Sequence, residues 1–273
     1  MSENMIFDSM EQRRKKILEE LNFKDRVYVK ALAQEFGVAM ETIRRDLDYL
    51  AANNQLKKIY GGAIKVKNTR LELLYNERMM HNLEGKRMIA LTAAHIIEDN
   101  DTIALLGGST TEQMIQHLLV KKNLVVVTNS LPIALGLLQC RKEGSFDGRV
   151  IVVGGETNAA SMATSGFFAE DMLAKLSVNK TFLSCAGFSP QNISTFREEH
   201  IQLSKLLLEK SDLRILVADA SKMNVRHLFS FATFEDIDIV VCNRKIPDEW
   251  ANEIDSDCLQ WIAAPEVPQS KKA

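Results

Sequence analysis

The sequence predicts an α/β protein in two parts, a small helical unit followed by a doubly wound, mostly parallel sheet. Over residues 1–65 apolar side chains recur at helical spacing, whereas beyond residue 100 short Val/Ile/Leu runs alternate with amphipathic segments. Strands that are apolar without polar alternation are covered on both faces. Their alternation with helices indicates a parallel sheet with helices on either side.

Composition narrows the class of protein before any motif is considered. Of 273 residues, 46% are hydrophobic and 26% charged, which is ordinary for a globular protein. The first residues lack the apolar core of a signal peptide, and no stretch offers about 18 unbroken apolar residues, so we expect a cytoplasmic protein without a membrane partner. The cysteines form no CxxC pair and the histidines form no i, i+4 pair or cluster, so no metal and no cofactor are expected.

Three helices are expected in the first unit, over residues 9–22, 30–37 and 40–55. Gly37 is placed to end the second helix, and Ile43, Leu47 and Leu50 give the third an apolar face. Helix, helix, tight turn and helix is the plan of a helix-turn-helix, whose last helix lies in the DNA major groove. Residues 1–67 hold 13 Lys/Arg against 10 Asp/Glu, a modest basic excess.

The outer face of the third helix and the segment LKKIYGGAIKV (56–66), which suits a β-hairpin wing, supply the candidate DNA contacts. These candidates are Met40, Glu41, Thr42, Arg44, Arg45, Lys57 and Lys58. Arg45 is the first choice for a base or phosphate contact, since both tasks favour arginine. Periodicity alone leaves an alternative open, because three-helix units with a merely solvated basic face are common.

A more specific pattern lies in ten positions: Arg13, Ile17, Leu21, Ala39, Thr42, Ile43, Arg44, Arg45, Asp46 and Leu47. In residue type and spacing the pattern resembles the helix-turn-helix of the DeoR family, and IYGGA (59–63) is similar to that family's wing. The resemblance implies a double-stranded DNA operator, and paired half-sites imply at least a homodimer. Ala39 replaces the family's usual Ser, which removes a helix cap of about 1 kcal/mol.

Residues 64–82 lose clear periodicity and gain charge, so we expect a DNA-binding domain over 8–66 and an effector domain over 80–260. In parallel sheets ligands gather where strands end. The loop after the first expected strand suits an anion, because glycines allow close approach and a helix start presents N–H groups. The candidate effector-binding residues are Gly107, Gly108, Ser109, Thr110, Thr111, Asn129, Gly155, Glu156, Asp219 and Lys222. For one loop alone, a tight turn with Thr110 as helix cap explains the pattern as well.

A second series of segments resembles the sensor domain that follows the DeoR-type DNA-binding module: EGKRMIA (84–90), DTIALLGGSTT, VVTNS, VVGGE, AGFS, ADASK and DIDIVV. That fold is similar to ribose-phosphate isomerase, in which the Gly-Ser/Thr loop holds a phosphate. The resemblance therefore implies a phosphorylated sugar as effector. Leu106, Asn192 and Asn243 depart from the usual Asp, Gly and Asp, so the identity of the sugar does not carry over.

Catalysis and sensing make different demands on this site. Sugar isomerisation needs a positioned carboxylate, yet no acidic residue lies between Thr181 and Arg197, which leaves only Glu156 and Asp219 as bases. There is also no GxxxxGK[ST], GxGxxG or GxSxG motif. We therefore expect no enzyme but a transcription regulator, a repressor of a carbohydrate catabolism operon. The alternative is an isomerase-like enzyme with an attached DNA-binding module.

Overall fold

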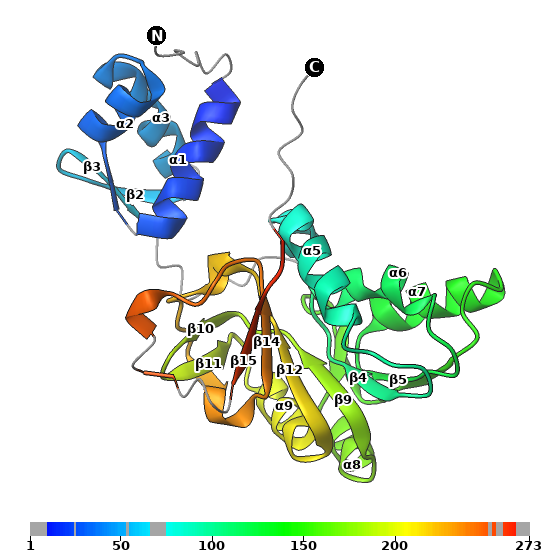
Figure 1. Ribbon diagram of the computed structural model, residues 1–273. Helices are drawn as coiled ribbons and strands as arrows, with labels where there is room; N and C mark the ends of the chain where they lie inside the picture. The colour runs from blue at the N-terminus through cyan, green and yellow to red at the C-terminus, as the bar shows by residue number, and fades with distance from the viewer. Residues whose placement is uncertain are drawn as a thin grey trace. The chain divides into compact units, whose positions relative to one another are not determined.

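The computed structural model describes residues 10–24, 26–52, 55–65, 75–250, 253–254 and 259–265. The chain separates into two compact units, residues 1–68 and 69–273 (Figure 1), and each is taken by itself below. This division falls inside residues 64–82, the segment in which the periodicity of the sequence changes.

Three helices build the first unit, α1 (Met10–Lys24), α2 (Val29–Phe36) and α3 (Met40–Ala52). Ile17, Leu32 and Leu47, one from each helix, are completely buried in a shared apolar cluster. α2 ends where Gly37 adopts a left-handed φ of 64° and donates its N–H to the carbonyl oxygen of Ala33. The predicted helix-turn-helix is therefore present.

A small antiparallel sheet completes this unit, with β1 (Arg26–Tyr28), β3 (Gly62–Lys65) and β2 (Leu56–Ile59) in that order. The hairpin of β2 and β3 turns at Tyr60 and Gly61 and forms the predicted wing. A Cβ atom on Gly62 would overlap the carbonyl oxygen of Val27. Only glycine at this position lets β3 pair closely with β1.

Within the described part of the second unit, seven parallel strands form the main sheet, in the order β15-β14-β12-β9-β4-β5-β6. They are β4 (Thr102–Leu105), β5 (Val125–Thr128), β6 (Arg149–Val152), β9 (Val178–Leu183), β12 (Ser211–Val217), β14 (Ile239–Cys242) and β15 (Gln260–Ala263). The chain runs outward from β4 through β5 and β6, then returns to the other side of β4 at β9. Such a reversal is a topological switch point, where sheets of this kind bind ligands.

Helices cover both faces of the sheet (Figure 1). On one face lie α5 (Leu83–Ala94), α6 (Ile115–Leu118) and α7 (Leu131–Lys142), and on the other lie α8 (Phe167–Ala174) and α9 (Glu199–Glu209). Along β4, Ile103 and Leu105 enter one apolar cluster while Ala104 enters the other. The predicted doubly wound α/β class is confirmed.

Several short elements have no sequence signal. They are α4 (Tyr75–Met80), the hairpin β7 (Glu156–Asn158) and β8 (Ala163–Ser165), and the antiparallel strands β10 (Gly187–Ser189), β11 (Asn192–Thr195) and β13 (Phe229–Ala232). 3-10 turns lie at η1 (Glu112–Met114), η2 (Ala220–Lys222), η3 (Phe234–Asp236) and η4 (Asp248–Trp250). All four residues of β11 are buried although three of them are polar, so no apolar run marks this strand. No helix in the described ranges is both long and apolar enough to span a bilayer.

Candidate functional site

The candidate DNA-reading surface is the outer face of α3 with the adjacent β2 strand. Ile43, Leu47 and Leu50 are buried and fix the inner face of the helix. The predicted contacts Met40, Glu41, Arg44, Arg45, Lys57 and Lys58 are exposed, and Thr42 is half-buried. The structure thus leaves these side chains accessible, and their contact with DNA stays a prediction.

The basic side chains on this surface differ in how tightly they are held. Arg45 is 80% exposed, and its Nε lies 3.9 Å from the Glu41 carboxylate. Arg44 approaches the same carboxylate at 3.4 Å, and Lys58 contacts Asp48. Exposed pairs of this kind contribute less than about 1 kcal/mol. A phosphate or a guanine edge can therefore replace Glu41 as the partner of Arg45 at little cost.

A buried ion cluster fixes α3 on α1. The carboxylate of Asp46, 1% exposed, accepts hydrogen bonds from Nε of Arg13 at 2.5 Å and from Nε of Arg14 at 2.8 Å. The Arg14 guanidinium also lies 3.7 Å from the centre of the Tyr49 ring, a cation–π distance. This cluster sets the direction in which the outer face of α3 points.

The second candidate site lies at the switch point, where the loops after β4 and β9 touch. A Cβ atom on Gly108 would overlap the Ser184 hydroxyl and lie 2.9 Å from the Ser184 Cβ. A Cβ atom on Gly107 would lie 3.2 Å from the Ala163 Cβ in β8. The two glycines therefore bring three separate segments together at one end of the sheet.

Hydrogen bonds divide the polar residues of this loop into two groups. Thr111 bonds to the carbonyl oxygen of Leu106 at 2.7 Å, and Asn129 accepts the N–H of Gly107 at 2.9 Å, so these side chains shape the loop. The Thr110 hydroxyl is buried and has no hydrogen-bond partner among the described residues. Ser109 is also buried. A buried hydroxyl without a partner is costly, and a role of Thr110 in effector binding stays a prediction.

Asp219 and Lys222 lie in the segment after β12, and Lys222 contacts the loop after β9. The Lys222 Nζ donates to the carbonyl oxygen of Cys185 at 2.5 Å, and Ser221 donates its N–H to Asp219 at 3.1 Å. Burial alone would raise the pKa of Asp219, but Lys222, the hydrogen bond from Ser221 and Lys86 together outweigh it and hold that pKa below its usual value. Asp219 is therefore charged, and its Oδ2 has no hydrogen-bond partner in the described ranges.

A cavity of about 20 Å³ lies between these loops and α9. Two of the predicted residues, Gly107 and Asn129, line it together with Leu106, Ser184, Thr195, His200, Leu203, Ser204 and Phe231. The sequence does not predict Ser184, Thr195, His200 or Ser204. They come from a loop, a short polar strand and a helix, so no local pattern connects them.

The other eight predicted effector residues do not line this cavity: Gly108, Ser109, Thr110, Thr111, Gly155, Glu156, Asp219 and Lys222. Of these, Gly155 and Glu156 lie at the start of the β7–β8 hairpin. Glu156 is exposed on β7, where it pairs with Ser165, and it does not line the cavity. Gly155 has a φ of 132°, and a Cβ atom there would overlap the carbonyl oxygen of Ser165. Gly155 thus serves the turn into the hairpin of β7 and β8, and its role in effector binding stays a prediction.

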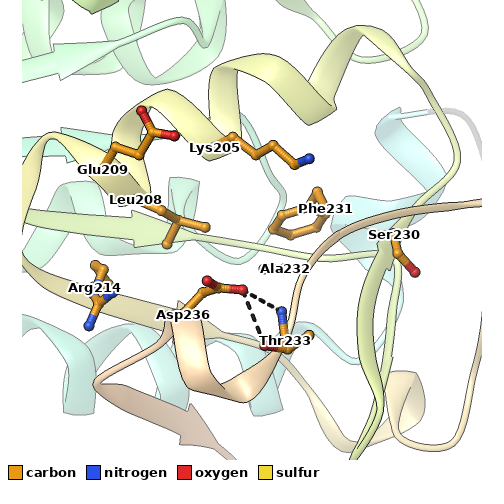
Figure 2. A pocket seen from close by; sticks show the side chains of 9 residues that line it. All are labelled: Lys205, Leu208, Glu209, Arg214, Ser230, Phe231, Ala232, Thr233 and Asp236. Carbon is orange, nitrogen blue, oxygen red and sulfur yellow. Dashed lines mark hydrogen bonds between the residues drawn. The ribbon is translucent and has the colours of Figure 1, made fainter.

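A larger groove of about 510 Å³ lies between α9, β12, β13 and η3 (Figure 2), and Phe231 lines both this groove and the smaller cavity. Its charged side chains are largely engaged. Arg214 makes two side-chain hydrogen bonds to Asp238, at 2.9 and 2.7 Å, and Asp236 accepts from the Thr233 N–H at 2.8 Å. These bonds join the middle of β12 to Asp238, the residue before β14, and hold the start of η3.

Glu112, the first residue of η1, follows the loop after β4, and its carboxyl makes the stability of the protein depend on pH. Burial raises the pKa of its carboxyl from 4.5 to about 7, so the folded chain holds this proton more tightly than the unfolded chain. The stability of wild type should therefore fall as pH rises from about 4.5 to 7. At pH 8, Glu112→Gln should therefore be more stable than wild type and unfold at a higher temperature. The gain in the free energy of unfolding should be only about 1 kcal/mol, because the side chain is only partly buried. The gain should shrink at pH 5.

Thermal unfolding at both pH values checks this expectation. Glu84→Gln, at an exposed position on α5, is the matched control and should show no pH-dependent difference. Identical pH profiles for wild type and Glu112→Gln would contradict the assignment.

Both units match families of known protein domains. The model of the DeoR-like helix-turn-helix domain matches residues 13–69, and that of the DeoR C terminal sensor domain matches residues 81–244. The chain is 33% identical over 262 residues to the uncharacterized HTH-type transcriptional regulator YulB of Bacillus subtilis, which covers 96% of this chain and 98% of the relative. It is 30% identical over 240 residues to the L-fucose operon activator of Haemophilus influenzae, over 88% and 94% of the two chains.

Among solved structures, a D-ribose-5-phosphate isomerase in complex with phospho-erythronic acid is similar over 52% of this chain and 54% of that chain, at 18% identity and a TM-score of 0.38. The family assignment depends on the sequence matches alone. They extend through the helix-turn-helix and the parallel sheet, and the match to YulB spans nearly the full length of both chains. The protein belongs to the DeoR family of helix-turn-helix transcriptional regulators.

Proposed function

We propose that the protein is a repressor of a carbohydrate catabolism operon and that a phosphorylated sugar, bound at the switch point, controls it. The observation that carries the effector site is the arrangement around the loop after β9. Gly108 and Thr110, whose hydroxyl has no hydrogen-bond partner in the described part of the chain, belong to the loop after β4. Lys222 donates to Cys185, in the loop after β9. Backbone N–H groups, a hydroxyl and an ammonium are the donors that a phosphate requires.

Control follows from linkage between the two units. An effector that binds one arrangement of the protein better weakens operator affinity by its differential affinity, typically about 1–3 kcal/mol. Paired half-sites favour a homodimer or larger oligomer. The operator is double-stranded DNA, so the proposal includes a cytoplasmic location and no membrane partner.

Binding without turnover is part of this proposal. Proton transfer between sugar carbons needs a carboxylate that is free to accept the proton. Despite burial, Lys222 and the hydrogen bond from Ser221 hold the pKa of Asp219 below its usual value, which makes it a weak base, and Glu156 lies on the hairpin outside the cavity. Conversion of any sugar phosphate by the purified chain, lost in Glu156→Gln or Asp219→Asn, would favour the isomerase-like alternative.

A thermal-shift screen of the full chain tests the effector site. Ribose 5-phosphate, fructose 6-phosphate, glucose 6-phosphate and their unphosphorylated sugars form the panel, with inorganic phosphate as ion control. One sugar phosphate should raise the unfolding temperature. At one hundred times its Kd it should stabilise the fold by about 2.7 kcal/mol. The same sugar phosphate should weaken binding of the protein to a duplex selected from a random DNA pool. Lys222→Met should lose the shift, whereas Lys205→Met, at an exposed position on α9, should keep it.

Three outcomes would contradict the proposal. A panel in which no sugar phosphate exceeds inorganic phosphate would remove the effector class. A full shift in Lys222→Met would remove the site. Higher reporter expression from the selected duplex in the presence of the protein than in its absence would show activation instead of repression.

A further inference from the structure

α4 is the first described element of the second unit, and residues 66–74 connect it to the DNA-binding unit. With six residues, α4 is far shorter than the roughly 12–15 residues that an isolated helix needs in water. Its conformation therefore depends on contacts from the rest of the second unit.

Two side-chain contacts anchor α4. Nη2 of Arg78 donates to the carbonyl oxygen of Ala160, in the turn between β7 and β8, at 3.2 Å. The Nζ of Lys86, on α5, donates to the carbonyl oxygen of Arg78 at 2.5 Å and also to that of His81. Lys86 is 2% exposed. Its ammonium thus closes the carboxyl end of α4 with charged hydrogen bonds, the stronger kind.

Lys86 also senses the charges of the proposed effector site. Burial lowers the pKa of Lys86 to about 8, the negative charge of Asp219 opposes this shift, and Lys222 and Arg78 add to it. Asp219 in turn retains an Oδ2 with no hydrogen-bond partner in the described part of the chain. The attraction that holds Asp219 charged is therefore shared between Lys222 and Lys86.

Close packing also links the start of α5, around Lys86, to residues 219–222. A Cβ atom on Gly85, the neighbour of Lys86, would lie 2.7 Å from the Asn82 side chain and 2.9 Å from that of Asn243. The Asn243 side chain accepts the N–H of Ala220 at 2.8 Å. Asn243 thus links residues 219–222 to the start of α5, where Lys86 lies.

We propose that Lys86 is the positioning residue that couples occupancy of the effector site to α4, and through it to the DNA-binding unit. An anion bound at Lys222 weakens the hold of Lys222 on Asp219. Asp219 then attracts the Lys86 ammonium away from the carbonyl oxygens of Arg78 and His81, and the end of α4 opens. This inference rests on the proposed function and adds the route by which the signal leaves the site.

Lys86→Met tests the coupling, because it keeps an unbranched apolar side chain of nearly the same length and removes the ammonium. Hydrogen exchange without any ligand should be faster at the amides of α4 than in wild type, and unchanged in α7. The DNA Kd of Lys86→Met is then measured for the selected duplex, with and without the most stabilising sugar phosphate of the panel. The ratio of the two Kd values should be no more than about 2. Wild type should show a ratio in the usual range of about 5–150.

Controls separate coupling from general damage to the fold. Lys86→Arg keeps the charge and should retain most of the ratio, and Arg87→Met, exposed on the same helix, should match wild type. The sugar Kd of Lys86→Met should stay within a few-fold of wild type. An unchanged ratio in Lys86→Met would overturn the inference while leaving the proposed function intact, whereas a wild type that does not respond would remove the proposed function itself.

Discussion

Asp46→Ala is expected to lower the free energy of unfolding of the DNA-binding unit by about 3–5 kcal/mol, because it leaves two arginines without their shared partner. Nε of Arg13 and Nε of Arg14 lie 2.5 and 2.8 Å from the Asp46 carboxylate, and the side chains of these arginines are only 10% and 13% exposed. Two guanidinium groups would then lie close together with no anion between them. Arg13 has little access to water, so solvent cannot replace the lost carboxylate.

The two units provide an internal control for this measurement. Both tryptophans, Trp250 and Trp261, belong to the second unit, whereas Tyr28, Tyr49 and Tyr60 belong to the first. Calorimetry should show the transition of the first unit at a lower temperature, and tryptophan emission should report an unchanged transition of the second. Asp48→Ala removes an exposed carboxylate from the same helix and should cost less than about 1 kcal/mol. Equal stability of Asp46→Ala and Asp48→Ala would show that the buried cluster contributes nothing.

Arg45→Ala should abolish most operator binding while leaving the unfolding temperature within a few degrees of wild type. One arginine contact to a base edge is worth about 1–3 kcal/mol. Two reading helices on paired half-sites double this, so affinity should fall by a factor on the order of 30 to 10,000. The fold should persist because Arg45 is 80% exposed and, among the described residues, pairs with Glu41 alone.

Fluorescence anisotropy at fixed salt, with the selected duplex, measures this loss. Arg87→Ala is the matched control, since Arg87 is also exposed and also pairs with a glutamate on its own helix. Titration at several salt concentrations separates two roles of Arg45. A smaller salt dependence in the variant indicates a phosphate contact, and a relaxed sequence preference indicates a base contact. Affinity equal to that of Arg87→Ala would show that another face reads the DNA.

The strands and helices with strong local patterns were predictable from the sequence. Leu124–Val127 is an uninterrupted apolar run, and β5 (Val125–Thr128) forms there, between β4 and β6 in the sheet. The spacing of Ile43, Leu47 and Leu50 correctly identifies the buried face of α3. In both cases the information lies within a few residues of the chain, because strand burial and helix periodicity are local properties.

The cavity at the switch point was less predictable, since its lining depends on contacts between distant segments. His200 and Ser204 reach the cavity because α9 packs on the sheet, and Thr195 reaches it from a strand with no apolar run. The position of Lys86 is a similar case. A lysine in an amphipathic helix is expected to be solvated, and only the fold shows that it is buried against the end of α4.

The pairing of strands far apart in the chain has a consequence for how the protein is made. Ile103 in β4 pairs with Lys180 in β9, and Val241 in β14 pairs with Ile262 in β15, so the main sheet cannot close until residue 263 has left the ribosome. The helix-turn-helix completes its pairing with Val27 and Ala63, much earlier in translation. Domains fold from the N-terminus during synthesis, and distant pairings form slowly. An unfinished chain can therefore carry a folded helix-turn-helix before the parallel sheet has formed.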